Sequence, residues 1–188
     1  YSTYKTITNC TIYAGASSGI RLDEGSHYSS VSGCTVNGNG SEANGGINIY
    51  NSSNCTVSNN VVNNASPGIW INSADGNTVN SNTVIAASTI GISIASANYL
   101  TLVGNYVTTS TSHGIQISAS KYVTANSNVV YLNGGAGIRV SGSSSSCTIV
   151  GNVCMDNCTA GGSVNSGINV DTGLNSTYIG NKCADSRS

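Results

Sequence analysis

The residues with acid–base chemistry are few and are scattered along the chain. The carboxylates lie at Asp23, Glu24, Glu42, Asp75, Asp156, Asp171 and Asp185. The densest group is Arg21, Asp23, Glu24 and His27, which Glu42 would join from the following turn. A histidine within reach of two carboxylates has the groups for general acid–base catalysis. Asp23, Glu24 and His27 are therefore weak catalytic candidates, although a solvated loop is the commoner role of such a group, and we predict no catalytic site.

The cysteines indicate an oxidising compartment, since there are seven of them in a small chain rich in Ser and Asn. Cys154, Cys158 and Cys183 are candidates for a disulfide, because Cys154 and Cys183 occupy equivalent positions of a repeat and Cys158 lies in a nearby insertion. Burial as small apolar side chains is the alternative. No second cysteine or histidine pair accompanies Cys154 and Cys158, so we predict no metal site. We also expect no cofactor.

A repeat of 22 or 23 residues positions all of these groups through the middle of the chain. One anchor of the repeat is a Gly-Ile pair, which begins at Gly19, Gly46, Gly68, Gly91, Gly114, Gly137 and Gly167. A second anchor is a threonine, found at Thr11, Thr35, Thr56, Thr78, Thr101, Thr124, Thr148 and Thr177. Four residues after seven of these threonines comes an asparagine, at Asn39, Asn60, Asn82, Asn105, Asn128, Asn152 and Asn181.

Each repeat contains three short apolar segments that alternate inward and outward residues, as short β-strands do. A unit of this size cannot close a core alone, whereas stacked copies share a continuous one. We therefore predict an all-β fold, a single β-solenoid of about eight turns. The asparagines would stack at one corner and form a hydrogen-bonded ladder along the axis. In this alignment Val36 and Val57 share one inward column, and Cys10, Cys34 and Cys55 share another.

The chain is predicted to be one domain, residues 1–188. A partial first turn covers residues 1–15, and insertions lie near residues 23–28, 38–44 and 155–163. Outward positions of the Gly-Ile strand form a polar strip that includes Trp70 and Arg139. Both are candidate binding residues, because an exposed Trp stacks on sugar rings or anchors a protein contact. His113 has no titratable neighbour in the sequence, and we assign it a structural role.

The segments Gly68-Ile69-Trp70-Ile71 and Asn77-Thr78-Val79, followed by Asn82 and Val84, carry a resemblance. This pattern resembles the right-handed parallel β-helix repeat of pectate-lyase-like polysaccharide enzymes, phage tailspikes, NosD-like proteins and many microbial, notably archaeal, surface proteins. The resemblance implies the fold but says little about function, because one solenoid hosts many sites. Polysaccharide enzymes of this kind use paired or clustered aspartates, and no such set falls on successive turns.

The low content of charged residues limits the kinds of molecule that the chain can bind. Charged residues make up 7% of the chain and the net charge is −1. Six scattered basic residues cannot neutralise a phosphate backbone, so nucleic acid is excluded as a partner. No apolar run is long enough to span a membrane. The chain starts at Tyr1 without a signal-like segment, as a mature extracellular or cell-surface protein does.

Two functions fit these observations. The first is a non-catalytic extracellular structural protein, a self-assembling subunit of a surface layer, sheath or filament. Its partner would be another copy bound head to tail, because no covering helix precedes Ile7 and Ile12 or follows Tyr178 and Cys183. The alternative is a carbohydrate-active or carbohydrate-binding β-helix domain of the polysaccharide lyase, hydrolase or epimerase kind, with polysaccharide as partner.

Overall fold

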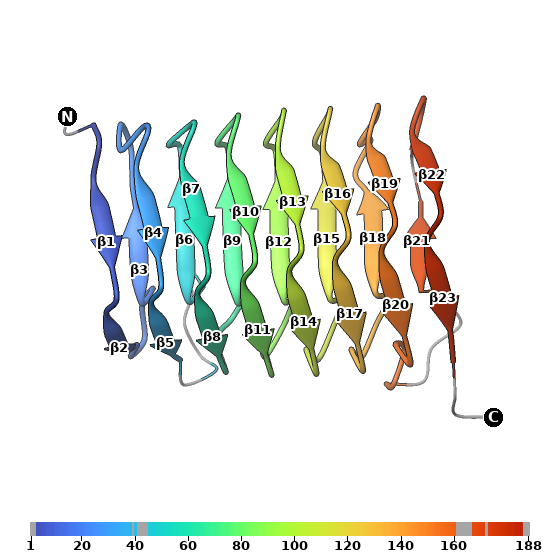
Figure 1. The fold of residues 1–188 in the computed structure, drawn as a ribbon, viewed down its shortest axis with the longest axis horizontal. Coiled ribbons are helices and arrows are strands. Elements are labelled where there is room, and N and C mark those ends of the chain that lie inside the picture. Colours follow the sequence, from blue (N-terminus) through green and yellow to red (C-terminus); the bar gives the residue numbers. More distant parts are fainter. Residues whose placement is uncertain (1–2, 39, 41–44, 161–166, 172, 186–188) are drawn as a thin grey trace.

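The chain winds into a parallel β-solenoid of three sheets (Figure 1). The computed structural model describes residues 3–38, 40, 45–160, 167–171 and 173–185. Successive turns lie side by side along the long axis, with the N-terminal turn at one end and the C-terminal turn at the other. Within the described ranges there is no helix, and hence none long and apolar enough to cross a membrane.

The strands are three or four residues long and alternate among the sheets, which we name A, B and C. Sheet A contains β1 (Thr6–Thr8), β4 (Ser30–Ser32), β7 (Thr56–Ser58), β10 (Thr78–Asn80), β13 (Thr101–Val103), β16 (Thr124–Asn126), β19 (Thr148–Val150) and β22 (Thr177–Ile179). Sheet B contains β2 (Thr11–Tyr13), β5 (Thr35–Asn37), β8 (Val61–Asn63), β11 (Thr83–Ile85), β14 (Tyr106–Thr108), β17 (Val129–Tyr131), β20 (Val153–Met155) and β23 (Lys182–Ala184). Sheet C contains β3 (Ile20–Leu22), β6 (Ile47–Tyr50), β9 (Ile69–Asn72), β12 (Ile92–Ala95), β15 (Ile115–Ser118), β18 (Ile138–Ser141) and β21 (Ile168–Val170).

The predicted fold is confirmed, with a slightly smaller number of turns. Sheets A and B have eight strands each, whereas sheet C has seven. The strands follow one another in the order A, B, C from β1 onward, so in the described part of the chain it is β22 and β23 that have no strand of sheet C after them. The partial first turn stays a prediction. The longest connections between strands run over residues 38–46 and 156–167.

Inward residues of equivalent turns stack into an apolar core. Ile92 pairs with Ile69 on one side and Ile115 on the other, and all three are fully buried. The glycine before each of these isoleucines is required by close packing between turns. A Cβ atom at Gly91 would lie 2.2 Å from Cγ1 of Val107 and 2.6 Å from the carbonyl oxygen of Gly114. This contact explains why Gly-Ile is the most regular element of the repeat.

The asparagine ladder is present at the corner between sheets A and B. Asn82 donates from its backbone N–H and from Nδ2 to Oδ1 of Asn105, at 3.1 and 3.0 Å. Its Nδ2 also donates to the carbonyl oxygen of Val57. The same contacts link Asn60, Asn82, Asn105, Asn128, Asn152 and Asn181 in order. The predicted member Asn39 lies outside the described residues.

The alignment of the first two turns is wrong by one sheet. Thr35 pairs with Val61 in sheet B, whereas Thr56 pairs with Ser30 in sheet A. Cys34 thus precedes a strand of sheet B and occupies the ladder position before Asn60, to whose Oδ1 its N–H donates. Cys55 precedes a strand of sheet A and lies in a different column. The cause is that strands led by threonine occur in both sheets, so the threonine anchor falls in sheet B at Thr11 and Thr35 and in sheet A from Thr56 onward.

Candidate functional site

The outer face of sheet C carries the predicted polar strip. Register pairing places its members next to one another from turn to turn, in the order Arg21, Asn48, Trp70, Ser93, Gln116, Arg139 and Asn169. Asn48 is buried and separates Arg21 from the rest, so the longer accessible stretch of this outer strip begins at Trp70. The strip is parallel to the solenoid axis, with one residue at each strand spacing of about 4.8 Å. An extended ligand chain could lie along it and meet a similar side chain at every turn.

Three titratable residues meet at the C-terminal part of this face. Arg139 lies in β18, His113 comes just before β15 on the preceding turn, and Asp171 directly follows β21 on the next one. Nε and Nη2 of Arg139 donate to Oδ2 of Asp171 at 2.9 and 2.6 Å. Nη1 of Arg139 lies 3.1 Å from Nε2 of His113. The ion pair with Asp171 therefore holds the guanidinium in place and leaves Nη1 beside the imidazole.

The backbone determines which nitrogen of His113 carries the proton. The N–H of Ala136 donates to Nδ1 of His113 at 3.0 Å, so Nδ1 is the acceptor of the neutral ring. Nε2 then bears the hydrogen. Because arginine only donates, Nε2–H and Nη1–H are two donors whose nitrogens lie 3.1 Å apart, and neither accepts from the other. An anionic oxygen beside the two nitrogens would accept from both.

The pKa of His113 lies below its ordinary range. Burial of the ring makes the largest contribution, because it disfavours the charged form, and the positive charge of Arg139 acts in the same direction. The carboxylate of Asp171 opposes both. The imidazole is consequently neutral at neutral pH, and Arg139 supplies the positive charge of the site.

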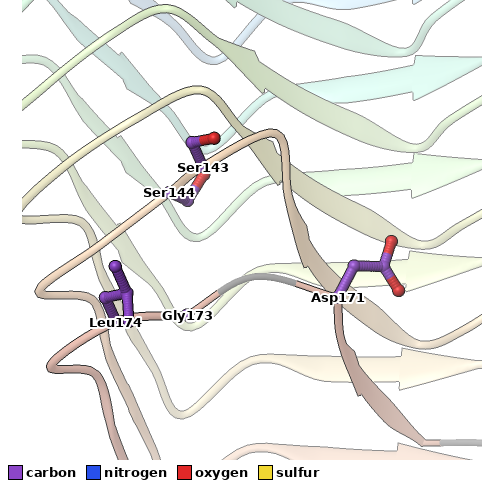
Figure 2. Close-up of a pocket in the computed structure, with 5 residues that line it drawn as sticks. All are labelled: Ser143, Ser144, Asp171, Gly173 and Leu174. Carbon is purple, nitrogen blue, oxygen red and sulfur yellow. The ribbon is translucent and has the colours of Figure 1, made fainter.

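A hollow of about 480 Å³ adjoins this cluster (Figure 2). It is lined by Ser143, Ser144, Asp171, Gly173 and Leu174. Figure 2 shows Ser143 and Ser144 on one loop and the other three on the loop of the next turn. Asp171 belongs to both the hollow and the ion pair, whereas Arg139 is not among the residues that line the hollow.

The catalytic candidates predicted from the sequence do not form a comparable site. Arg21 pairs with Asp23 at 3.1 Å and lies over the ring of Tyr50. Nδ1 of His27 accepts the backbone N–H of Ser53, and no contact among the described residues joins it to Asp23 or Glu24. Glu42 lies outside the described residues. His113, which we had assigned a structural role on the sequence, is the histidine that meets a charged side chain.

No disulfide joins any two of the seven cysteines, all of which lie in the described part of the chain. Cys154 and Cys183 lie side by side in neighbouring turns, and their thiols are in hydrogen-bond contact. Burial raises the pKa of both. Cys158 lies on the connection after β20, and a disulfide within this trio stays a prediction. No group of three metal-binding side chains occurs among the residues that the structure describes.

The pattern of the family of right-handed β-helix regions matches residues 1–92 and 41–183. The chain belongs to this family. A search of curated proteins by sequence finds no match. Solved structures similar to this β-helix chain include the periplasmic alginate epimerase AlgG, with a TM-score of 0.71 and 22% identity over 94% of this chain. The Dettilon tailspike protein aligns with a TM-score of 0.77 and 18% identity over 97% of the chain. The enzymatically active domain of tailspike protein 2 of bacteriophage CBA120 has a TM-score of 0.68 and 12% identity over 96%.

The chain spans 43%, 42% and 35% of these three structures, so it corresponds to less than half of each. At these identities the likeness establishes the fold. The neighbours nevertheless contradict our first functional prediction, a non-catalytic, self-assembling structural subunit, and favour the carbohydrate alternative. Head-to-tail association is a prediction that nothing in the structure tests.

Proposed function

We propose that this chain is a carbohydrate-binding β-helix domain whose ligand is an acidic polysaccharide, lying along the outer strip of sheet C. The observation that supports it most is the donor pair, Nε2 of His113 and Nη1 of Arg139, for which the described residues supply no acceptor. The carboxylate of a uronic acid unit supplies that acceptor in the geometry that charged hydrogen bonds favour. The epimerase among the structural neighbours is named for alginate, a uronic acid polymer.

The rest of the strip suits such a chain. Gln116 and Ser93 offer polar groups to sugar hydroxyls on the two turns before Arg139, and Trp70 lies one turn further. The strand spacing of about 4.8 Å is close to the length of one pyranose unit in an extended chain. Successive sugars would therefore meet successive turns, with one carboxylate held at Arg139 and one ring against Trp70. Such a ligand also implies a location outside the cytoplasm.

Arg139→Gln should weaken binding to sodium alginate by about tenfold or more, since a charge-assisted hydrogen bond contributes about 1.5–3 kcal/mol. Retardation in native gels containing alginate measures the effect. Arg21→Gln is a matched control: it lies in the same column and pairs with Asp23 as Arg139 pairs with Asp171, with side-chain exposures of 37% and 34% for the two arginines. The control should bind within about twofold of the wild type. Equal losses in both variants would reduce the effect to bulk charge and contradict the assigned site.

Binding should strengthen as the pH is lowered from about 7.5 to about 5.5. The pKa of His113 is depressed in the free protein, and a carboxylate at Nε2 would raise it, because the anion favours the charged ring. Binding then takes up a proton, so affinity increases as the pH falls between the bound and free pKa values. His113→Gln should show a flat profile over this range. A wild-type profile that is equally flat would place the ligand away from His113.

Stability should respond to pH in the opposite direction. A histidine whose pKa is lower folded than unfolded binds fewer protons in the native state. The free energy of unfolding therefore decreases as the pH falls below the ordinary histidine pKa, and His113 contributes no such loss above it. Urea unfolding of the wild type and of His113→Gln across this range separates the two effects.

Chemistry at the uronate is a second candidate, favoured by the neutral imidazole beside a guanidinium. Removing the proton next to a carboxylate needs a base and a cation that stabilises the charge. In the structure the lone pair of His113 is on Nδ1 and is occupied by the N–H of Ala136, so Nε2 is placed as a donor. This geometry favours recognition over proton abstraction. Exchange of solvent deuterium into alginate, or ultraviolet absorbance of unsaturated products, would reveal turnover.

A further inference from the structure

A second group of exposed rings lies on another part of the surface, the corner between sheets C and A. Tyr99 and Tyr122 stack with a centroid separation of 4.9 Å and an interplanar angle of 9°. Tyr4 and Tyr28 form a similar stack at 5.5 Å. All four occupy one column, which the backbone bonds from each turn to the next define. We call this column the tyrosine edge.

The rings contribute little to the core. Tyr99 is 63% exposed and Tyr122 is 49% exposed. Both have left-handed backbones, with φ of 58° and 56°, which bulky residues disfavour. Asn54 and Gly76, which tolerate this conformation, occupy the same column on intervening turns. Stacking between the two rings offsets only part of the free-energy cost of these backbone conformations. Stability alone therefore does not explain why tyrosines occupy these positions.

The geometry of the stack leaves ring faces accessible. A centroid spacing of 4.9 Å exceeds the contact distance of about 3.5 Å between stacked carbon atoms, so the two rings do not cover each other completely. Each ring thus leaves part of one face open to solvent. The apolar C–H face of a pyranose ring packs against such a surface.

Polar groups run beside the rings in the neighbouring column. Asp75, Asn98 and Lys121 follow one another there, with Asn98 donating to Asp75 and accepting from the N–H of Lys121. Lys121 immediately precedes Tyr122 and forms no ion pair with any described residue. A cation next to two exposed rings suits a sugar that carries a carboxylate, with Asp75 two turns away from it.

We propose that the tyrosine edge, centred on Tyr99, Tyr122 and Lys121, is a second saccharide-binding surface that stacks the pyranose rings of an acidic polysaccharide. It lies apart from His113 and Arg139 and does not depend on their role. Two parallel contact lines on one solenoid would let the protein bind two chains, or hold one polymer that folds back around it.

The test uses native gels with sodium alginate or neutral hydroxyethylcellulose, and the intact chain in the Arg139→Gln background. The double variant Tyr99→Ala/Tyr122→Ala, made in this background, should be retarded at least fivefold less than the Arg139→Gln parent in both gels. Tyr106→Ala is the matched control, because Tyr106 is 40% exposed on sheet B of the same turn, and it should migrate like its parent. Lys121→Ala should lose retention in alginate and keep it in hydroxyethylcellulose.

Several outcomes would overturn the proposal. One is retention of the double variant equal to that of Tyr106→Ala, with both melting as the parent does. Another is a change in sedimentation without a change in retention, which would make the tyrosine edge a contact between copies. If the double variant is unstable, Tyr99→Leu/Tyr122→Leu keeps side-chain bulk and should still lose retention. The outcome for the sheet C site is separate. If Arg139→Gln alone bound alginate as the wild type does, the sheet C site would be refuted, and the comparison of the tyrosine variants with their parent would still test the tyrosine edge.

Discussion

Ile92→Asp should prevent the chain from folding into a stable solenoid. The side chain of Ile92 is fully buried between Ile69 and Ile115, and none of the described lysines and arginines is buried in the core, where it could pair with a carboxylate. Burying an unpaired charge and losing a packed isoleucine together cost about 4 kcal/mol or more, a large share of the 5–15 kcal/mol that stabilises a domain. Circular dichroism and urea unfolding should show a loss of cooperative folding.

Ser93→Asp provides the control, because Ser93 is the next residue of the same strand and points outward. Its free energy of unfolding should change by no more than about 0.5 kcal/mol. If Ile92→Asp melted like the wild type while Ser93→Asp unfolded, the inward and outward faces of sheet C would be exchanged. A one-residue slip of register moves every side chain of a strand to the other face.

The sequence was sufficient for the architecture because the repeat is carried by residues with specific physical roles. The Gly-Ile pair indicates close packing between turns, because only glycine fits there, and the regularly spaced asparagines indicate the hydrogen-bonded ladder. The assignment of strands to sheets was less secure, and the triplet Thr-Val-Asn shows why. It forms β5 in sheet B at residues 35–37 and β10 in sheet A at residues 78–80. Since the same three residues suit either sheet, only the lengths of the connections distinguish them.

The candidate site could be predicted in part. Arg139 was correctly placed on the outer strip, and the repeat spacing brings Gln116 next to it. His113 was missed because it precedes its strand and lies in a column that contains Pro67, Ile90 and Ala136, which suggests no shared role. The Gly-Ile pairs Gly114, Gly137 and Gly167 already place His113, Arg139 and Asp171 on successive turns. Their contact was missed because the three residues occupy different positions of the repeat, so that a comparison of one column at a time does not bring them together.

A second ladder escaped the sequence argument for a related reason. Asn133 and Asn157 lie at the corner after sheet B, and both the backbone N–H and Nδ2 of Asn133 donate to Oδ1 of Asn157. The equivalent positions on earlier turns are Ala65, Ala87 and Ser110, so no column of one residue type is visible. Small residues pack this corner where Asn is absent, and a ladder forms only where two turns supply amides.

Asn105→Leu should destabilise the solenoid nearly as much as a core substitution. Oδ1 of Asn105 accepts the backbone N–H and the Nδ2 of Asn82, and its own Nδ2 donates to the carbonyl oxygen of Val79. Leucine has a similar size but removes the partner of the Asn82 backbone N–H and of the Val79 carbonyl oxygen, while Nδ2 of Asn82 keeps only its bond to Val57. Each unsatisfied buried group costs about 1–3 kcal/mol, so the free energy of unfolding should fall by about 2–6 kcal/mol. Urea unfolding would measure this loss, with Asn126→Leu as the control. The side chain of Asn126 points outward, and its Oδ1 accepts the hydroxyl of the adjacent Ser127. The control should change the free energy of unfolding by about 0.5 kcal/mol or less. Equal losses in the two variants would mean that the ladder contributes no more than an ordinary surface amide, and that apolar stacking alone holds successive turns in register.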